Sequence, residues 1–163
     1  MKRRTFISNM LLAGAAVTAY PYLASAASND LKDFDKWQLS DAEWRKRLNN
    51  VQYGVLRDED TEPAYSNAME SNKRDGSYHC AGCDLEAYSS AHKFESGTGW
   101  PSFWQPINAK FVETKTDFRA IWPRTEVHCA RCGGHQGHVF KDGPKPTGLR
   151  YCLNSAAIIF KAA

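Results

Sequence analysis

Two Cys-x-x-Cys motifs constrain the fold of this chain more than any other feature. They are Cys80-Ala81-Gly82-Cys83 and Cys129-Ala130-Arg131-Cys132, with residues 84–128 between them. Four thiolates at this spacing suit the tetrahedral coordination of one structural zinc ion, which leaves no open position for a substrate. Two disulfides are the alternative, because thiols oxidise in secreted proteins. The spacing favours zinc, since neither motif begins a helix after a strand as a redox Cys-x-x-Cys does.

The first 26 residues have the pattern of an export signal. Lys2-Arg3-Arg4 precede an apolar run from Met10 to Leu23, and Ala24-Ser25-Ala26 resembles a cleavage site, so we expect cleavage after Ala26. The paired arginines followed by Phe6 are typical of the bacterial twin-arginine signal, whose cargo crosses the membrane folded. An ordinary secretory signal is the alternative. The run is short for a permanent membrane span, so we predict a periplasmic protein without a stable membrane anchor.

The charge of the chain comes from this signal. The sequence has 21 basic and 18 acidic residues, and the excess of three equals Lys2, Arg3 and Arg4. Residues 27–163 are therefore neutral overall, which gives no indication of a nucleic-acid partner or of an anionic membrane surface. Their length is that of a single domain.

A short helix is predicted to begin after Ser40. Ser40 and Glu43 match the capping box, in which the third helical residue accepts a hydrogen bond from the backbone of the cap residue. Residues 27–37 are polar and are expected to form a loose lead-in to one domain over 38–163. The residues expected on the buried side of the helix are Ala42, Trp44, Leu48 and Val51.

From Gln52 onward the pattern changes to short apolar runs broken by Gly, Pro, Asn and Asp. Such a pattern is typical of short antiparallel strands joined by turns, so we predict a mainly β domain with one or two N-terminal helices. The runs interpreted as strand segments are 53–56, 78–79, 111–114, 118–121, 125–128, 138–140, 149–153 and 157–160.

Cys152 is the one cysteine left when the other four are paired by spacing. In a strand, Arg150, Cys152 and Asn154 share one face, and Leu149, Tyr151 and Leu153 share the other. A cation beside a thiol favours the nucleophilic thiolate, and an amide can hold a polar substrate atom. A buried free cysteine on a core strand is an equally good interpretation of these residues alone.

Two further stretches are candidates for a site. His135 and His138 follow the second cysteine motif directly, although an isolated histidine is more often an ordinary surface or supporting residue. In Gly97-Thr98-Gly99-Trp100-Pro101, the glycines and the proline favour a fixed backbone that displays Trp100, and a tryptophan packed in a core turn is the alternative.

With these residues assembled, the chain resembles the B-type methionine sulfoxide reductases, which are peptide-methionine (R)-S-oxide reductases. The resemblance covers about residues 38–160. It implies two antiparallel sheets arranged as a β-tent, one structural zinc ion and a catalytic cysteine at Cys152. The motifs that carry it, besides the two cysteine pairs, are Glu43-Trp44-Arg45, Gln52-Tyr53, Thr61-Glu62-Pro63, 93–103, 125–127, 137–144 and 146–156.

The resemblance also implies roles for the remaining candidates. Cys152 attacks the sulfoxide sulfur and becomes a sulfenic acid, while an acid protonates the oxygen. Trp100 cradles the substrate methyl group. The sulfoxide oxygen is bound by His135, His138 and Asn154, with His138 the preferred proton donor, and Arg150 and Asp142 shape the local field.

One departure from the family pattern indicates how the Cys152 sulfenic acid is reduced. Many relatives carry a resolving cysteine where this chain has Thr98, and the other four cysteines are assigned to zinc. We therefore predict that an external thiol, such as a thioredoxin-like protein, reduces the Cys152 sulfenic acid. Gln136 and residues 121–123 also depart from the usual pattern, which leaves substrate preference at the rim of the site open.

Two other functions are compatible with part of the sequence. A non-enzymatic zinc-binding module of the same fold has no need for Cys152, Trp100 and His138 together. A zinc hydrolase requires an open metal position, and four cysteines close the site.

Overall fold

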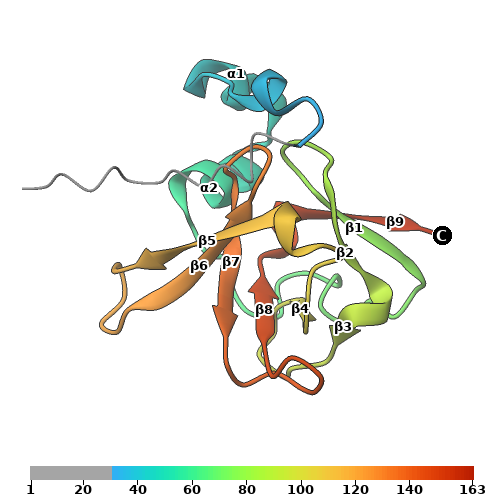
Figure 1. The fold of residues 1–163 in the computed structure, drawn as a ribbon. Helices are drawn as coiled ribbons and strands as arrows, with labels where there is room; N and C mark the ends of the chain where they lie inside the picture. Colours follow the sequence, from blue (N-terminus) through green and yellow to red (C-terminus); the bar gives the residue numbers. More distant parts are fainter. Residues whose placement is uncertain (1–30) are drawn as a thin grey trace, which may run out of the picture.

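The computed structural model describes residues 31–163, so the predicted export signal over 1–26 lies outside the described residues. Within them the chain is mainly β: two short α-helices precede two antiparallel sheets, which confirms the predicted fold class (Figure 1). None of the helices in this part is both long and apolar enough to cross a membrane.

Two consecutive helices begin the domain. Helix α1 spans Asp41–Arg47, and Glu43 accepts a 2.8 Å hydrogen bond from the Ser40 backbone as the capping box predicts. The chain turns extended at Leu48, and the Asn49 side chain then caps helix α2, Asn50–Asp58. The predicted strand over 53–56 is therefore wrong, because those residues lie inside α2, which begins at its own capping residue, Asn49.

The break between the helices also changes which side chains are buried. Trp44 and Leu48 are in the core as predicted, but Ala42 is exposed, and so is Val51, which lies in α2 after the chain has turned extended at Leu48. The lead-in is more ordered than predicted. Phe34–Trp37 forms a 3-10 turn, η1, and buries Trp37 beside α1.

All strand pairings are antiparallel. The smaller sheet has the order β2-β1-β9 and the larger the order β3-β4-β8-β7-β6-β5. The strands are β1 Gly76–Cys80, β2 Glu86–Ser89, β3 Lys93–Phe94, β4 Ser102–Phe103, β5 Val112–Asp117, β6 Arg124–Cys129, β7 His135–Phe140, β8 Arg150–Leu153 and β9 Ile158–Ala162. Short 3-10 turns lie at η2 Ser90–His92, η3 Ala109–Phe111 and η4 Ser155–Ala157.

The predicted strand over 118–121 is also wrong. These residues form the turn between β5 and β6, and their apolar side chains are exposed instead of packed. An apolar run alone does not distinguish a strand from an exposed turn, because burial depends on what the rest of the chain places against it.

Aromatic side chains join the two sheets. Phe103 of the larger sheet lies 4.9 Å from both Tyr78 and Tyr88 of the smaller sheet, measured between ring centroids. Leu153 and Val127 complete this fully buried layer. A second core, at the end of the molecule covered by α1 and α2, packs Trp44 and Leu56 against the cysteine motifs. The sheets are thus fixed relative to each other at both places.

Candidate functional site

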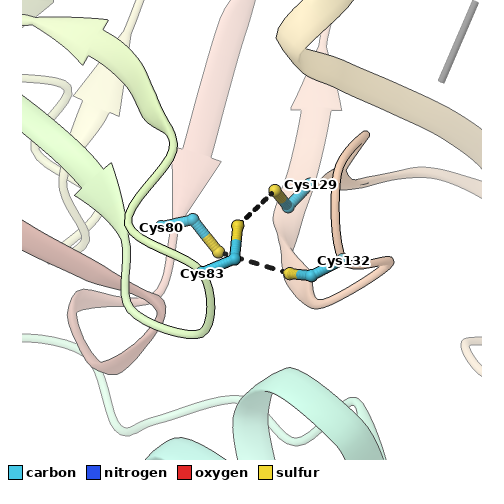
Figure 2. A group of neighbouring side chains, drawn as sticks. All are labelled: Cys80, Cys83, Cys129 and Cys132. Atoms are coloured by element: carbon cyan, nitrogen blue, oxygen red, sulfur yellow. Dashed lines mark hydrogen bonds between the residues drawn. The ribbon is translucent and has the colours of Figure 1, made fainter. Parts of the chain in front are cut away.

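The four motif cysteines converge at the end of the molecule that α1 and α2 cover (Figure 2). Their sulfur atoms all lie within 4.8 Å of one another, with 3.6 Å between Cys80 and Cys132 and 3.5 Å between Cys83 and Cys129. A disulfide needs about 2.0 Å between sulfurs. Four sulfurs at about 2.3 Å from a tetrahedral zinc ion lie about 3.8 Å apart. The geometry therefore fits a metal ion and not two disulfides.

The surroundings of this cluster lower the pKa of one thiol, that of Cys83, while hydrogen bonds among the thiols and burial raise the pKa of Cys80 and of Cys129. All four cysteines are buried, and Arg131 donates to the Cys83 sulfur at 3.4 Å and to the Cys83 carbonyl. Hydrogen bonds from the other three thiols, with Arg131 in addition, hold the pKa of Cys83 well below its usual range. Because Cys80 ends β1 and Cys129 ends β6, the cluster connects the two sheets.

A separate pocket of about 100 Å³ contains most of the predicted catalytic residues. It opens where strands β7 and β8 lie side by side, next to the segment that carries Trp100. The residues that line it are Thr61, Trp100, Arg124, Gly137, His138, Phe140, Cys152, Leu153 and Asn154.

Strand pairing places Cys152 in this pocket. In the register of the sheet Cys152 lies between His138 of β7 and Ser102 of β4, so one face of the sheet carries all three. Leu153, on the opposite face as predicted, is fully buried between the sheets. Cys152 itself is partly exposed, which a nucleophile requires.

A hydroxyl group stands next to the Cys152 sulfur. The Thr98 hydroxyl lies 3.8 Å from it, and Ser96 links Thr98 to Ser102 through hydroxyl contacts of 2.8 and 2.7 Å. Ser102 in turn donates to the Trp100 carbonyl at 3.1 Å. These contacts fix the rotamers around the thiol and place a hydroxyl group within hydrogen-bonding distance of the sulfur.

His138 is oriented by a carboxylate that the sequence did not identify. Its Nε2 lies 2.8 Å from Asp117 Oδ2, which also accepts from Arg124 at 2.7 Å. Hydrogen bonds from the Arg119 backbone, His138 and Arg124 hold the pKa of Asp117 well below its usual range. Burial lowers the pKa of His138, and the bond with Asp117 opposes that shift. Asp117 and Arg124 are paired in the sheet where β5 ends and β6 begins.

His135 lies behind His138 and is not among the residues that line the pocket. The two rings meet edge to face with centroids 5.4 Å apart, and His135 Nδ1 lies 3.0 Å from the buried Glu126. Burial raises the pKa of Glu126, but His135 and Lys115 outweigh this and the pKa is lowered. The position of His135 suits support of the His138 ring more than direct contact with a ligand.

Glu62 holds Trp100 and Asn154 at the pocket. Its backbone carbonyl accepts from the Trp100 indole at 3.0 Å, and its N–H donates to the Asn154 amide oxygen at 3.0 Å. Its carboxylate accepts from the backbone of Ser155 and Ala156 at 2.5 and 3.1 Å. Sequence reasoning did not identify this role, and the Thr61-Glu62-Pro63 motif was the only signal of it.

Arg150 and Asp142 lie at the border of the pocket. The guanidinium makes two hydrogen bonds to the Asp142 carboxylate, at 2.9 and 2.8 Å, and stacks 4.3 Å from the Phe140 ring that lines the pocket. The bond to Asp142 raises the pKa of Arg150, and negative charge on Cys152 adds to the shift. Arg150 therefore supplies positive charge near the thiol, as the strand pattern predicted.

The structure thus brings Cys152, His138, Asn154 and Trp100 to one pocket, with Arg150 and Asp142 beside it. A polarised thiol, a histidine with an oriented ring and an aromatic wall can bind a small polar group that carries an apolar substituent. They can then attack it and move a proton at the same place.

Proteins similar to this chain are named peptide methionine sulfoxide reductases. A family model described as SelR domain matches residues 48–162. Peptide methionine sulfoxide reductase MsrB of Leptospira interrogans is 49% identical over 122 residues, which are 75% of this chain and 93% of that protein. The protein of the same name from Methanosarcina barkeri is 52% identical over 122 residues, 75% and 86% of the two chains. Peptide methionine sulfoxide reductase B1, chloroplastic, of Oryza sativa is 52% identical over 124 residues, 76% and 58% of the two chains.

Proposed function

Since this chain belongs to the SelR-domain family of type B peptide methionine sulfoxide reductases, we propose that Cys152 is the nucleophile with which it reduces the R epimer of methionine sulfoxide in proteins. The reaction class, peptide-methionine (R)-S-oxide reduction, follows from the family. The observation that supports the residue assignment is the position of Cys152 in one pocket with His138 and Trp100.

The first half of the cycle transfers one oxygen atom. The Cys152 thiolate attacks the sulfoxide sulfur, the sulfur–oxygen bond of the substrate breaks, and the oxygen ends on the Cys152 sulfur. Methionine and a protonated sulfenic acid are the products, so the methionine sulfur is reduced by two electrons and the Cys152 sulfur is oxidised by two.

His138 supplies a proton to the sulfoxide oxygen in this scheme. Because Nε2 is committed to Asp117, Nδ1 is the ring nitrogen left for the substrate. Donation from Nδ1 requires the imidazolium form, which the Asp117 carboxylate stabilises. Asn154 lies at the same pocket, and both ends of its amide are held by backbone groups of Glu62 and Gln136.

Trp100 and Phe140 form the apolar part of the pocket. A methyl group on sulfur fits against an aromatic ring through the polarisable sulfur–aromatic contact. The hydrogen bond from the Trp100 indole to the Glu62 carbonyl fixes the plane of that ring. The two epimers exchange the methyl group and the oxygen, so a fixed aromatic wall opposite a fixed donor selects one of them.

The second half of the cycle needs an external thiol in our proposal. Thr98, and not a cysteine, stands beside Cys152, and the other four cysteines form the buried cluster. The sulfenic acid condenses with one thiol to give a mixed disulfide and water, and a second thiol releases Cys152 and leaves as the reductant's disulfide. A dithiol protein of the thioredoxin kind supplies both thiols.

We propose that Cys80, Cys83, Cys129 and Cys132 hold one structural zinc ion. Their separations and their burial fit a closed four-sulfur site. Zinc would cross-link the two sheets and would take no part in the chemistry at the pocket.

Export to the periplasm remains a proposal from the sequence of residues 1–26. Folding and metal loading before export would protect four thiols from an oxidising compartment, which gives a twin-arginine signal a purpose. Replacement of Arg3 and Arg4 by lysine should abolish export of the full chain, and unchanged export would indicate the general secretory route.

The proposed reaction is tested by turnover of separate R and S epimers of a methionine sulfoxide peptide with dithiothreitol. We expect the protein to reduce the R epimer and Cys152→Ser to reduce neither. A Cys152→Ser variant that keeps R-specific activity would contradict the assignment. A zinc-loaded wild-type protein inactive on both epimers would contradict the function itself.

A further inference from the structure

The turn between β5 and β6 carries an exposed apolar surface that the reaction does not use. Phe118, Ile121 and Trp122, which we call the apolar tip, are 76%, 94% and 78% exposed. Figure 1 shows the β5–β6 hairpin extending beyond the body of the domain. Single exposed apolar residues need no explanation, but three large ones within five positions mark an interaction surface.

The turn is fixed where it joins strands β5 and β6. The Arg119 backbone donates to Asp117 at 2.8 Å, and its guanidinium binds the carbonyl of Asp58 and the carboxylate of Glu59 at the end of α2. Arg124 closes the hairpin by its ion pair with Asp117. The turn is therefore anchored at its ends and at Arg119, while the side chains of the apolar tip remain exposed.

The apolar tip continues the rim of the catalytic pocket. Along the chain it lies between Asp117, which binds His138, and Arg124, which lines the pocket. Glu126 is the register partner of His138, and Arg124 is two residues from it along β6, about 7 Å at 3.3 Å per strand residue. An extended polypeptide with its oxidised methionine in the pocket reaches the tip within a few residues.

We propose that the apolar tip binds apolar side chains next to the methionine sulfoxide in a polypeptide substrate, so that the enzyme prefers polypeptides with apolar sequence around the oxidised residue. This inference rests on the proposed function and adds a substrate class to it. Methionine packs among apolar side chains, and its oxidation disrupts cores. The segment that exposes a methionine sulfoxide is therefore typically apolar, which matches the chemistry of the tip.

The test compares three substrates with three proteins. The substrates are capped methionine sulfoxide amide, a peptide with leucine and valine around the sulfoxide, and a peptide of equal length with serine and glycine there. The proteins are the wild type, the triple variant Phe118→Ser/Ile121→Ser/Trp122→Ser, and the control Val51→Ser/Ile159→Ser. The control removes exposed apolar side chains from α2 and β9 instead.

We expect the triple variant to raise KM for the apolar peptide about tenfold, the effect of losing roughly one buried apolar contact. Its kcat, its activity on the capped amide and its KM for the serine-glycine peptide should stay at wild-type values. The control should match the wild type throughout. In a Cys152→Ser protein, Trp122→Phe should reduce the change in tryptophan fluorescence that the apolar peptide causes and should leave unchanged the one that the capped amide causes.

Three results would overturn the inference. One is equal KM values for both peptides in the wild type. Another is a triple variant whose only defect is a raised KM for a thioredoxin-like reductant, which would make the tip a reductant surface. The third is concentration-dependent dimerisation of the wild type that the triple variant abolishes, which would make it a self-association surface. A wild-type protein that does not reduce the capped amide at all would instead contradict the proposed function.

Discussion

The contact between Thr98 and Cys152 determines, at the scale of single residues, what the thiol can do. A cysteine at position 98 would lie close enough to capture the sulfenic acid, whereas a hydroxyl 3.8 Å away offers the sulfur only a hydrogen bond. In the proposed cycle this position therefore offers the Cys152 sulfur a hydroxyl contact and no second thiol.

Thr98→Val is expected to lower kcat/KM about fivefold, because a hydrogen bond to the thiolate contributes about 1 kcal/mol. Valine keeps the shape of threonine and removes the hydroxyl. Thr98→Ser keeps the hydroxyl and is the control, with near wild-type activity in the same peptide assay. Equal kcat/KM for valine and serine would show that the hydroxyl has no role.

Asp117 sets the protonation of His138. Burial lowers the pKa of His138, while Asp117 raises it and Arg124 lowers it. Removal of the Asp117 charge leaves burial, Arg124 and His135, which all lower the pKa of His138, unopposed, so the pKa falls further and the imidazolium fraction at any given pH decreases.

Asp117→Asn should therefore move the pH profile of sulfenic acid formation to lower pH, with a slower single-turnover rate near neutrality. The rate is measured between about pH 5 and 8, where histidine titrates. Asp142→Asn is the matched control, since that carboxylate pairs with Arg150 and not with His138. If the Asp117 and Asp142 variants share the wild-type profile, His138 is not the proton donor.

At the scale of elements, the pairing of β7 with β8 positions Cys152, the proposed nucleophile. Gly137 allows the two strands to approach, because a Cβ atom there would lie 2.0 Å from the Cys152 carbonyl oxygen. A side chain at Gly137 cannot be accommodated without moving the strand that carries Cys152.

Gly137→Ala is expected to cost about 1–3 kcal/mol of unfolding free energy and most of the activity, since overpacking here displaces backbone. Gly148→Ala is the control: its φ of 70° strains alanine by about 1–2 kcal/mol, but no atom lies within 4 Å of the added Cβ. Urea unfolding measures the stability of each variant and peptide turnover its activity, and only Gly137→Ala should lose most of its activity. Full activity in Gly137→Ala would mean that β8 tolerates displacement.

Sequence patterns predicted the elements that depend on local signals. The Ser40 cap and the strands around residues 78–79, 125–128 and 138–140 are present. The run over 53–56 was misassigned because Asn49 begins a second helix, and the run over 118–121 because nothing packs on it. Both errors concern short apolar runs, whose hydrophobic period does not separate helix, strand and exposed turn.

The same limit explains which parts of the site the sequence missed. Cys152, Trp100 and His138 were identified by chemical type and family motif. The partners that orient them act over long sequence separations: Glu62 binds the backbone of residues 155 and 156, and Asp117 binds His138 across neighbouring hairpins. Such contacts follow from sheet topology, which a single sequence does not specify.

At the scale of the whole molecule, the cysteine cluster and the aromatic core fix one sheet relative to the other. If zinc occupies the cluster, a thiol reagent should titrate one cysteine in the native protein, Cys152. All five cysteines of the chain should react after denaturation with a chelator, together with release of one zinc ion. Two disulfides would instead leave one reactive thiol in both states and no zinc.

The four clustered cysteines do not line the pocket that holds Cys152, so Cys152 is the one thiol of the pocket in the proposed redox cycle. The most direct measurement is the mass of the wild-type protein after one equivalent of R-methionine sulfoxide peptide without reductant. We predict a gain of one oxygen atom at Cys152, trapped as an adduct by a sulfenic acid reagent such as dimedone, with the other four cysteines unchanged. A mass lower by two hydrogen atoms, with Cys152 in a disulfide to another cysteine of the chain, would contradict the single-cysteine cycle.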